Sequence, residues 1–310
     1  MTDPHHHAVL LYDDADELRA AVADRADGEL VVLACRPEHN RLLAAACPGA
    51  LLQPRPETFR RPVAVLAAVR RLLRHPDRRP GAPVRYVAEP DHGTTAGDWA
   101  RAATYDAACD VALAGEPMTT VSAYPRAGTP AEVLSGRVHT TPDGDAPRPD
   151  PGVPPVRLLS GSRDRYDIGP VRARAAEALA GLPTLIRTDF VAALNEVLTN
   201  AYLHGRPPVD VTVWLTADRV EGRVTDRGPG FDDPLAGYRP GSGGTRTGSG
   251  LWLARQACDD VDAWPAPEGF TVRLATAIAP ELARQTYGAI ARAEVAQARV
   301  DFRQVRSRPR

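Results

Sequence analysis

The stretch Ala193-Leu194-Asn195-Glu196-Val197-Leu198-Thr199-Asn200-Ala201 decides the interpretation of the second half of the chain. It lies within Leu185–His204, where the spacing of apolar residues predicts a helix. Glu196, Asn200 and His204 stand at i, i+4 and i+8, so a helix brings all three to one face. Such a polar stripe is often only the solvated side of a helix, and these three residues alone leave both interpretations open.

A strand-end carboxylate follows this helix in the sequence. The segment Val220–Asp226 predicts a strand, and a tight turn through Gly228 and Gly230 comes directly after Asp226. A carboxylate at a strand end can accept a hydrogen bond from a ligand, while glycines let the ligand approach the backbone closely. An ordinary Asp-Gly turn is the alternative interpretation.

A second glycine-rich stretch, residues 241–250, runs directly into a predicted helix over Leu251–Asp260. Glycines that open a helix expose backbone N–H groups, and the helix dipole favours anions there. The stretch therefore predicts a phosphate cradle, although a structureless loop would have the same composition.

The net charge and the absence of lysine exclude several classes of binding site and catalytic site. The 310 residues carry a formal net charge of −1, which argues against a broadly basic nucleic-acid binder. All 38 basic residues are arginines, so the chain has no lysine for a P-loop, for the strand lysine of eukaryotic-type protein kinases or for a pyridoxal phosphate Schiff base. Any nucleotide site here must work without lysine.

The first 140 residues alternate predicted strands and helices. The strands are His7–Tyr12, Glu29–Cys35, Val84–Glu89 and Met118–Tyr124, and the helices are Asp13–Asp27, Glu38–Cys47, Val63–Arg74 and Thr95–Leu113. This alternation predicts βαβ units, and therefore an α/β domain with a doubly wound, mostly parallel sheet.

Six prolines between residues 141 and 156 interrupt regular structure and predict a semi-rigid linker. We therefore expect a domain over 1–140, a linker over 141–156, a second domain over 157–277 and a helical tail over 278–310. The second domain contains both predicted helices and predicted strands. Its other predicted elements are helix Ile168–Leu182 and strands Val209–Leu215 and Phe270–Thr276, and the tail helix is Pro280–Val305.

Taken in order, the three motifs of the second half resemble the Bergerat ATP-binding fold of DNA gyrase, the heat-shock chaperone, mismatch-repair ATPases and histidine kinases. The stretch from Ala193 through His204-Gly205 is most similar to the anti-sigma-factor serine kinases. The resemblance covers residues 158–275 and implies an α+β two-layer sandwich that binds ATP and Mg²⁺. It implies that Asn200 coordinates Mg²⁺ and that Glu196 is the general base for an acceptor hydroxyl.

The same resemblance implies roles for the glycine-rich motifs. Asp226 would accept the adenine amino hydrogen, and Gly228 and Gly230 would let base and ribose approach. The phosphates would be held by Gly248, Gly250 and Leu251. Arg246 would neutralise transferring charge, although a solvated loop arginine is the simpler interpretation.

One departure from the histidine kinases narrows the expected function. A typical histidine kinase carries a helical hairpin with the phosphoacceptor histidine before this domain, whereas residues 141–182 offer one short predicted helix and no histidine. The resemblance therefore favours a serine/threonine kinase of the anti-sigma type that phosphorylates an antagonist protein, sequesters a sigma factor, or both. A sensor histidine kinase and a non-catalytic, ATP-dependent binding module remain alternatives. His204 is expected to be structural or to support the residues that contact the ligand, and not to accept phosphate. Relatives in the kinase branch dimerise, so a homodimer is allowed.

The first half resembles the MEDS sensory domain. The resemblance rests on His7-Ala8-Val9-Leu10-Leu11-Tyr12, Asp13-Asp14, Glu89-Pro90 and Tyr105–Asp110. It implies a RecA-like core without a P-loop that senses a small molecule, with His7, Tyr12 and Glu89 as candidate pocket residues. Strand-end polar residues without a ligand are the alternative. The opening residues lack a signal peptide pattern and no stretch reaches ~20 apolar residues, so we expect a cytoplasmic protein without membrane or direct nucleic-acid contact.

Overall fold

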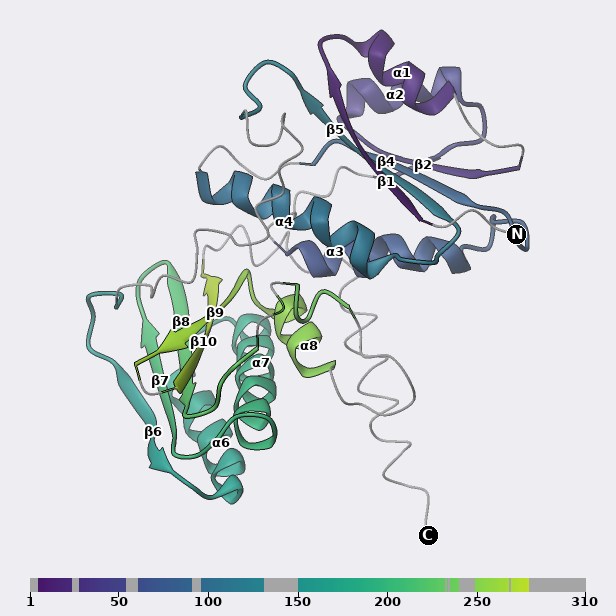
Figure 1. Ribbon diagram of the computed structural model, residues 1–310. Helices are drawn as coiled ribbons and strands as arrows, with labels where there is room; N and C mark the ends of the chain where they lie inside the picture. The colour runs from purple at the N-terminus through teal and green to yellow at the C-terminus, as the bar shows by residue number, and fades with distance from the viewer. Residues whose placement is uncertain are drawn as a thin grey trace.

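The computed structural model describes residues 5–23, 28–53, 61–90, 96–130, 150–231, 233, 235–239, 249–267 and 269–278. It contains two five-stranded sheets, one in each half of the chain (Figure 1). The predicted tail helix Pro280–Val305 lies outside the described residues.

The N-terminal sheet is entirely parallel and has the strand order β1-β5-β4-β2-β3. Its strands are β1 (His6–Tyr12), β2 (Leu30–Ala34), β3 (Leu51–Leu52), β4 (Val84–Ala88) and β5 (Met118–Pro125). The predicted parallel α/β architecture is thus confirmed. Strand β3 was not expected, because two apolar residues are too few to show a strand period.

Helices cover both faces of this sheet (Figure 1). They are α1 (Ala15–Ala23) and α2 (Pro37–Ala46) on one face, and α3 (Pro62–Arg71), the 3₁₀ turn η1 (Leu72–Arg74) and α4 (Ala96–Ala112) on the other. Because successive side chains of a strand point to opposite faces, Val31 and Leu33 pack toward α1 and α2, while Val32 packs toward α3 and α4. This two-sided burial explains the uninterrupted apolar strands.

The C-terminal sheet is antiparallel and has the order β6-β7-β8-β10-β9. Its strands are β6 (Val156–Ser162), β7 (Val209–Leu215), β8 (Arg219–Asp226), β9 (Asp260–Ala266) and β10 (Gly269–Ala277). The 3₁₀ turn η2 (Arg165–Asp167) precedes the helices α6 (Ile168–Ala178), α7 (Thr184–Leu203) and α8 (Ser249–Ala257). The three helices share one apolar core with one face of the sheet, which confirms the predicted α+β layers.

The predicted helix over Leu251–Asp260 is wrong at its end. Helix α8 stops at Ala257, the backbone N–H of Asp259 donates to the carbonyl of Ala275 at 3.0 Å, and Asp260 opens β9. Pairing with β10 therefore overrides the helical pattern. The edge strand β9 carries Pro265, and the opposite edge strand β6 has two register shifts along its pairing with β7.

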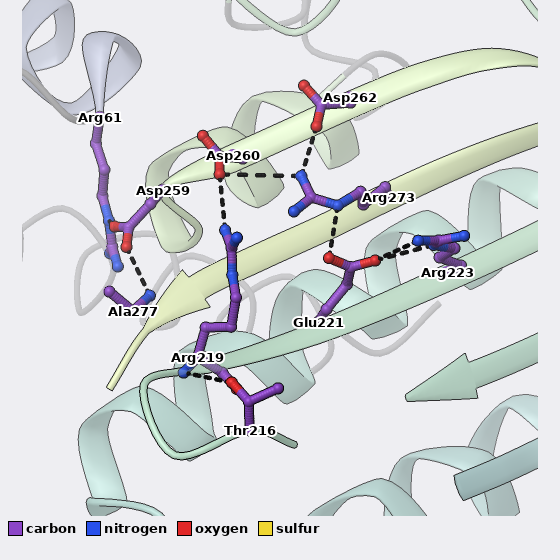
Figure 2. A network of polar contacts seen from close by, with 10 residues as sticks. All are labelled: Arg61, Thr216, Arg219, Glu221, Arg223, Asp259, Asp260, Asp262, Arg273 and Ala277. Carbon is purple, nitrogen blue, oxygen red and sulfur yellow. Dashed lines mark hydrogen bonds and ion pairs between the residues drawn. The ribbon is translucent and has the colours of Figure 1, made fainter. Parts of the chain in front are cut away.

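The face of this sheet opposite the helices carries a charged network (Figure 2). The guanidinium of Arg273 lies 2.8 Å from Glu221 and 2.6 Å from Asp262. The guanidinium of Arg223 lies 4.9 Å from the ring centroid of Trp214, and it also contacts Glu221. Because both carboxylates and both guanidinium groups are largely buried, each charge needs the others as partners.

Truncation of Phe190 tests the helix-on-sheet core. Its ring is fully buried and meets β8 at Gly222, where an added Cβ would lie 3.0 Å from the ring. We expect Phe190→Ala to lower the free energy of unfolding by about 3–5 kcal/mol in urea denaturation followed by circular dichroism. Leu203→Ala, on the same helix but 63% exposed, is the control and should change it by less than about 0.5 kcal/mol. Equal losses in the two variants would contradict this account of the core.

Candidate functional site

Helix α7 positions Glu196 and Asn200 at one end of the C-terminal domain. Leu194, Val197 and Leu198 of the same helix are buried in the core, so the two polar residues lie on the adjoining face. The N-terminus of α8 packs against them. A Cβ added to Gly250 would lie 3.0 Å from Glu196 Oε2 and 3.2 Å from Asn200 Nδ2. The structure thus brings together residues from two of the three sequence motifs.

The third motif joins them through the end of α7. The carbonyl of Asn200 accepts the backbone N–H groups of His204 and Gly205, and the chain then runs past the end of β8. A Cβ at Gly205 would overlap the carboxylate of Asp226, so only glycine fits there. Gly205 is a site residue that we did not predict, although its position directly after the helix was a usable signal. His204 follows the last residue of α7, and its side chain is exposed.

The carboxylate of Asp226 is held by backbone donors on one oxygen. Asp226 Oδ1 accepts the N–H of Gly228 at 2.5 Å and the N–H of Arg206 at 3.2 Å. Among the described residues, none donates to Oδ2. The side chain is 7% exposed, so this group is fixed in position and keeps one oxygen for another partner.

Gly230 was expected to be glycine so that a ligand can approach, and the structure adds a second reason, its backbone conformation and its contact with Phe270. Its φ is +75°, which L side chains rarely adopt, and a Cβ there would overlap the Phe270 ring. Phe231 packs on the same ring with a centroid distance of 5.1 Å. Leu251 lies in the first turn of α8, while Arg246 and Gly248 lie outside the described residues.

In the N-terminal domain, Tyr12 and Glu89 meet at the carboxyl end of the sheet. The Tyr12 hydroxyl donates to Glu89 Oε1 at 2.5 Å. Glu89 Oε2 accepts the N–H of Arg36 at 2.7 Å and lies 2.9 Å from His39 Nδ1. Burial and the bond to Glu89 raise the Tyr12 pKa, so its hydroxyl keeps its proton. Arg36 and His39 were not predicted, because they follow β2 and only the fold brings them to the end of β4.

His7 does not join this group. It lies five residues before Tyr12, and an odd spacing on a strand puts the two side chains on opposite faces of the sheet. His7 instead contacts Asp106 Oδ1 at 3.1 Å and Thr120 Oγ1 at 2.8 Å beneath α4. The three pocket candidates therefore form two separate buried clusters.

Comparisons with known proteins agree with this division of the chain. The profile of the MEDS domain, described as a methanogen/methylotroph, DcmR sensory domain, matches residues 6–140. The profile of the histidine kinase-like ATPase domain matches residues 162–276. The chain is a MEDS sensory domain followed by a histidine kinase-like ATPase domain. It is thus an ATP-binding regulatory protein with an N-terminal sensor. None of the curated proteins matches the chain.

Within the described ranges, no three His, Cys, Asp or Glu side chains come close enough together to hold a metal ion. In the same ranges, no helix has the length and apolar character needed to span a bilayer.

The His7 cluster makes the stability of the MEDS domain depend on pH. Burial opposes the charge on His7, but the hydrogen bond to the Asp106 carboxylate favours it, and the His7 pKa is raised. A raised folded-state pKa contributes stability that is complete below the unfolded value of 6.5 and is lost as pH rises through the folded-state value.

We therefore expect His7→Gln to lower the free energy of unfolding by about 1–3 kcal/mol at pH 6. The difference from the wild type should shrink steadily up to pH 9.5, as measured by urea denaturation across the range. His6→Gln is the matched control, because His6 is the neighbouring residue and its side chain is exposed. A difference for His7→Gln that does not change with pH would contradict a charged His7.

Proposed function

We propose that this protein is a regulator of the anti-sigma type, in which the ATPase domain phosphorylates a serine or threonine of an antagonist protein, binds a sigma factor, or both. The MEDS domain would control this activity in response to a small molecule. The main support is the order of elements before α7. Residues 150–183 form β6, η2 and α6, which leaves no helical hairpin in this range, and residues 141–203 contain no histidine.

The site geometry supports phosphoryl transfer to a hydroxyl. Glu196 and Asn200 lie one helical turn apart beside the N-terminus of α8, where backbone N–H groups favour phosphate. Glu196 would take the proton of the acceptor hydroxyl, and Asn200 would hold Mg²⁺. When bound, Mg²⁺ would neutralise charge on the phosphates. The residue types suit these groups, because Glu196 and Asn200 supply oxygen atoms and Gly250 lets the α8 backbone approach them without a side chain in between.

The adenine would bind at Asp226, whose Oδ2 has no donor among the described residues and suits the exocyclic amine. Gly228 at this end of β8 would let the base approach. Gly248, Gly250, Leu251 and Arg246 keep their proposed roles at the phosphates.

Asp226→Asn tests nucleotide binding with little disturbance of the fold. The variant keeps an amide oxygen for the N–H groups of Gly228 and Arg206 but replaces Oδ2 with a donor. We expect the Kd for a fluorescent ATP analogue with Mg²⁺ to rise at least ~10-fold, as measured by fluorescence titration. Asp218→Asn, in the exposed turn between β7 and β8, is the control. Unchanged binding in Asp226→Asn would remove the adenine assignment.

Glu196→Gln separates a kinase from a non-catalytic binding module. We expect this variant to bind ATP but to lose at least ~100-fold in phosphate transfer to a captured partner protein, because the amide cannot accept the hydroxyl proton. Full regulatory effect of the variant in cells would favour the module. An acid-labile phosphate on the purified chain would favour a sensor histidine kinase instead.

For the MEDS domain, we propose a RecA-like core in which Tyr12 and Glu89 contact the sensed molecule. His7 would act from the separate cluster beneath α4. We also propose a cytoplasmic location, the domain limits 1–140, 141–156, 157–277 and 278–310, and self-association as a homodimer. A pull-down from the native host that recovers a sigma factor or its antagonist would support the proposed partners.

A further inference from the structure

We propose that the MEDS domain restrains the ATP site by docking α3 on α8, and that Arg61 is the residue that fastens this contact. The inference depends on the proposed function, since it concerns regulation of the same site. Figure 1 shows α3 and α4 between the parallel sheet and α8, so the two domains meet at the helix that borders Glu196 and Asn200.

The contact has an apolar part. Leu235, Tyr238 and Trp252 of the ATPase domain pack into the core cluster that α3 and α4 form with the parallel sheet. Tyr238 is 6% exposed, as buried as residues of the MEDS core itself. Arg239, next to it, donates to the carbonyl of Val111 in α4. The ATPase residues on both sides of the stretch 241–248 thus contact the MEDS domain.

The polar part is centred on Arg61, at the start of α3. Its side chain is 3% exposed, and its Nε donates to Asp259 Oδ1 at 2.7 Å (Figure 2). Its Nη1 also donates to the carbonyl of Gln256 in the last turn of α8 at 3.3 Å. Asp259 Oδ2 accepts the backbone N–H of Ala277 at 2.9 Å, which links the pair to β10. Each charge of this largely buried pair has its partner only in the docked arrangement, so removal of either side chain would leave a buried charge unpaired there and weaken the docking.

Arg255 makes α8 and the segment 235–239 one unit. Its guanidinium lies 4.4 Å from the Tyr238 ring centroid. It also donates to the carbonyls of Ala236 at 2.8 Å and Val261 at 2.9 Å. A movement of α3 away from α8 would therefore act on the whole helix, which is nine residues or roughly 13 Å long.

The other end of α8 borders the candidate phosphate site. A Cβ added to Gly250 would lie 3.0–3.3 Å from atoms of Glu196 and Asn200, so the backbone of α8 packs directly against both residues. Mg²⁺ held by Asn200 would also need phosphate oxygens and water as ligands, and a shift of α8 would change the space for them. In this proposal, docking of α3 holds α8 against Asn200 and opposes loading of Mg²⁺–ATP, and release of α3 favours it. By linkage, ATP would weaken the docking to the same extent.

The test compares nucleotide affinity of the full-length chain with and without the ion pair. We expect Arg61→Ala and Asp259→Asn each to lower the Kd for a fluorescent ATP analogue with Mg²⁺ about fivefold. Asp259→Asn retains an oxygen atom that can accept the Ala277 N–H, so this variant still tests the ion pair if Arg61→Ala fails to fold. Arg70→Ala is the matched control. Arg70 lies on α3, the helix that Arg61 precedes, but its ion pair is with Glu116 of the MEDS domain and does not reach the ATPase domain. The Kd of this control variant should equal that of the wild type.

A Kd that is unchanged or higher in both interface variants, with normal binding by the wild type, would overturn this inference alone. Failure of the wild type to bind nucleotide would overturn the proposed function, and this inference with it. Hydrogen exchange without nucleotide gives an independent readout. The amides of α8 should exchange faster in the interface variants than in Arg70→Ala, and equal rates would contradict the restraint.

Discussion

The burial of α7 on the antiparallel sheet is the contact on which the ATPase domain depends. Phe190 and Leu194 lie against Gly222 of β8, and this packing fixes the rotation of the helix about its axis. That rotation turns Glu196 and Asn200 toward α8. The end of the same helix brings Gly205 against Asp226. One apolar contact therefore orients the candidate groups of both the phosphate end and the adenine end.

In the MEDS domain, the alternation of side chains along β1 decides which face of the sheet each candidate residue occupies. Tyr12 faces α1 and α2 and meets Glu89, while His7 faces α4 and meets Asp106. The Tyr12 cluster lies on the far side of the sheet from the ATPase domain, and the His7 cluster lies on the near side. A ligand at Tyr12 would thus act across the sheet, whereas a change at His7 would act directly on the α3/α4 layer.

Much of this architecture could be predicted from the sequence, because most strands and helices carry strong local patterns. The apolar runs of β2 and β4 and the i, i+4 spacing of Glu196 and Asn200 are examples. Strand β9 could not be predicted, since it is acidic, contains Pro265 and exists through pairing with β10. The ion pair between Arg61 and Asp259 could not be predicted from the sequence either, because 198 positions separate the two residues. Local patterns predict elements, while contacts between distant elements require the fold.

The two edges of the antiparallel sheet influence how another protein can attach to it. Pro265 removes a backbone donor from β9, and Asp260 and Asp262 add charge along that strand. At the other edge, the register shifts of β6 disturb the even row of N–H and C=O groups that an incoming strand would need. Both edges thus resist strand addition. A partner protein would bind this domain through side chains and loops, and the same features protect the sheet from edge-to-edge aggregation.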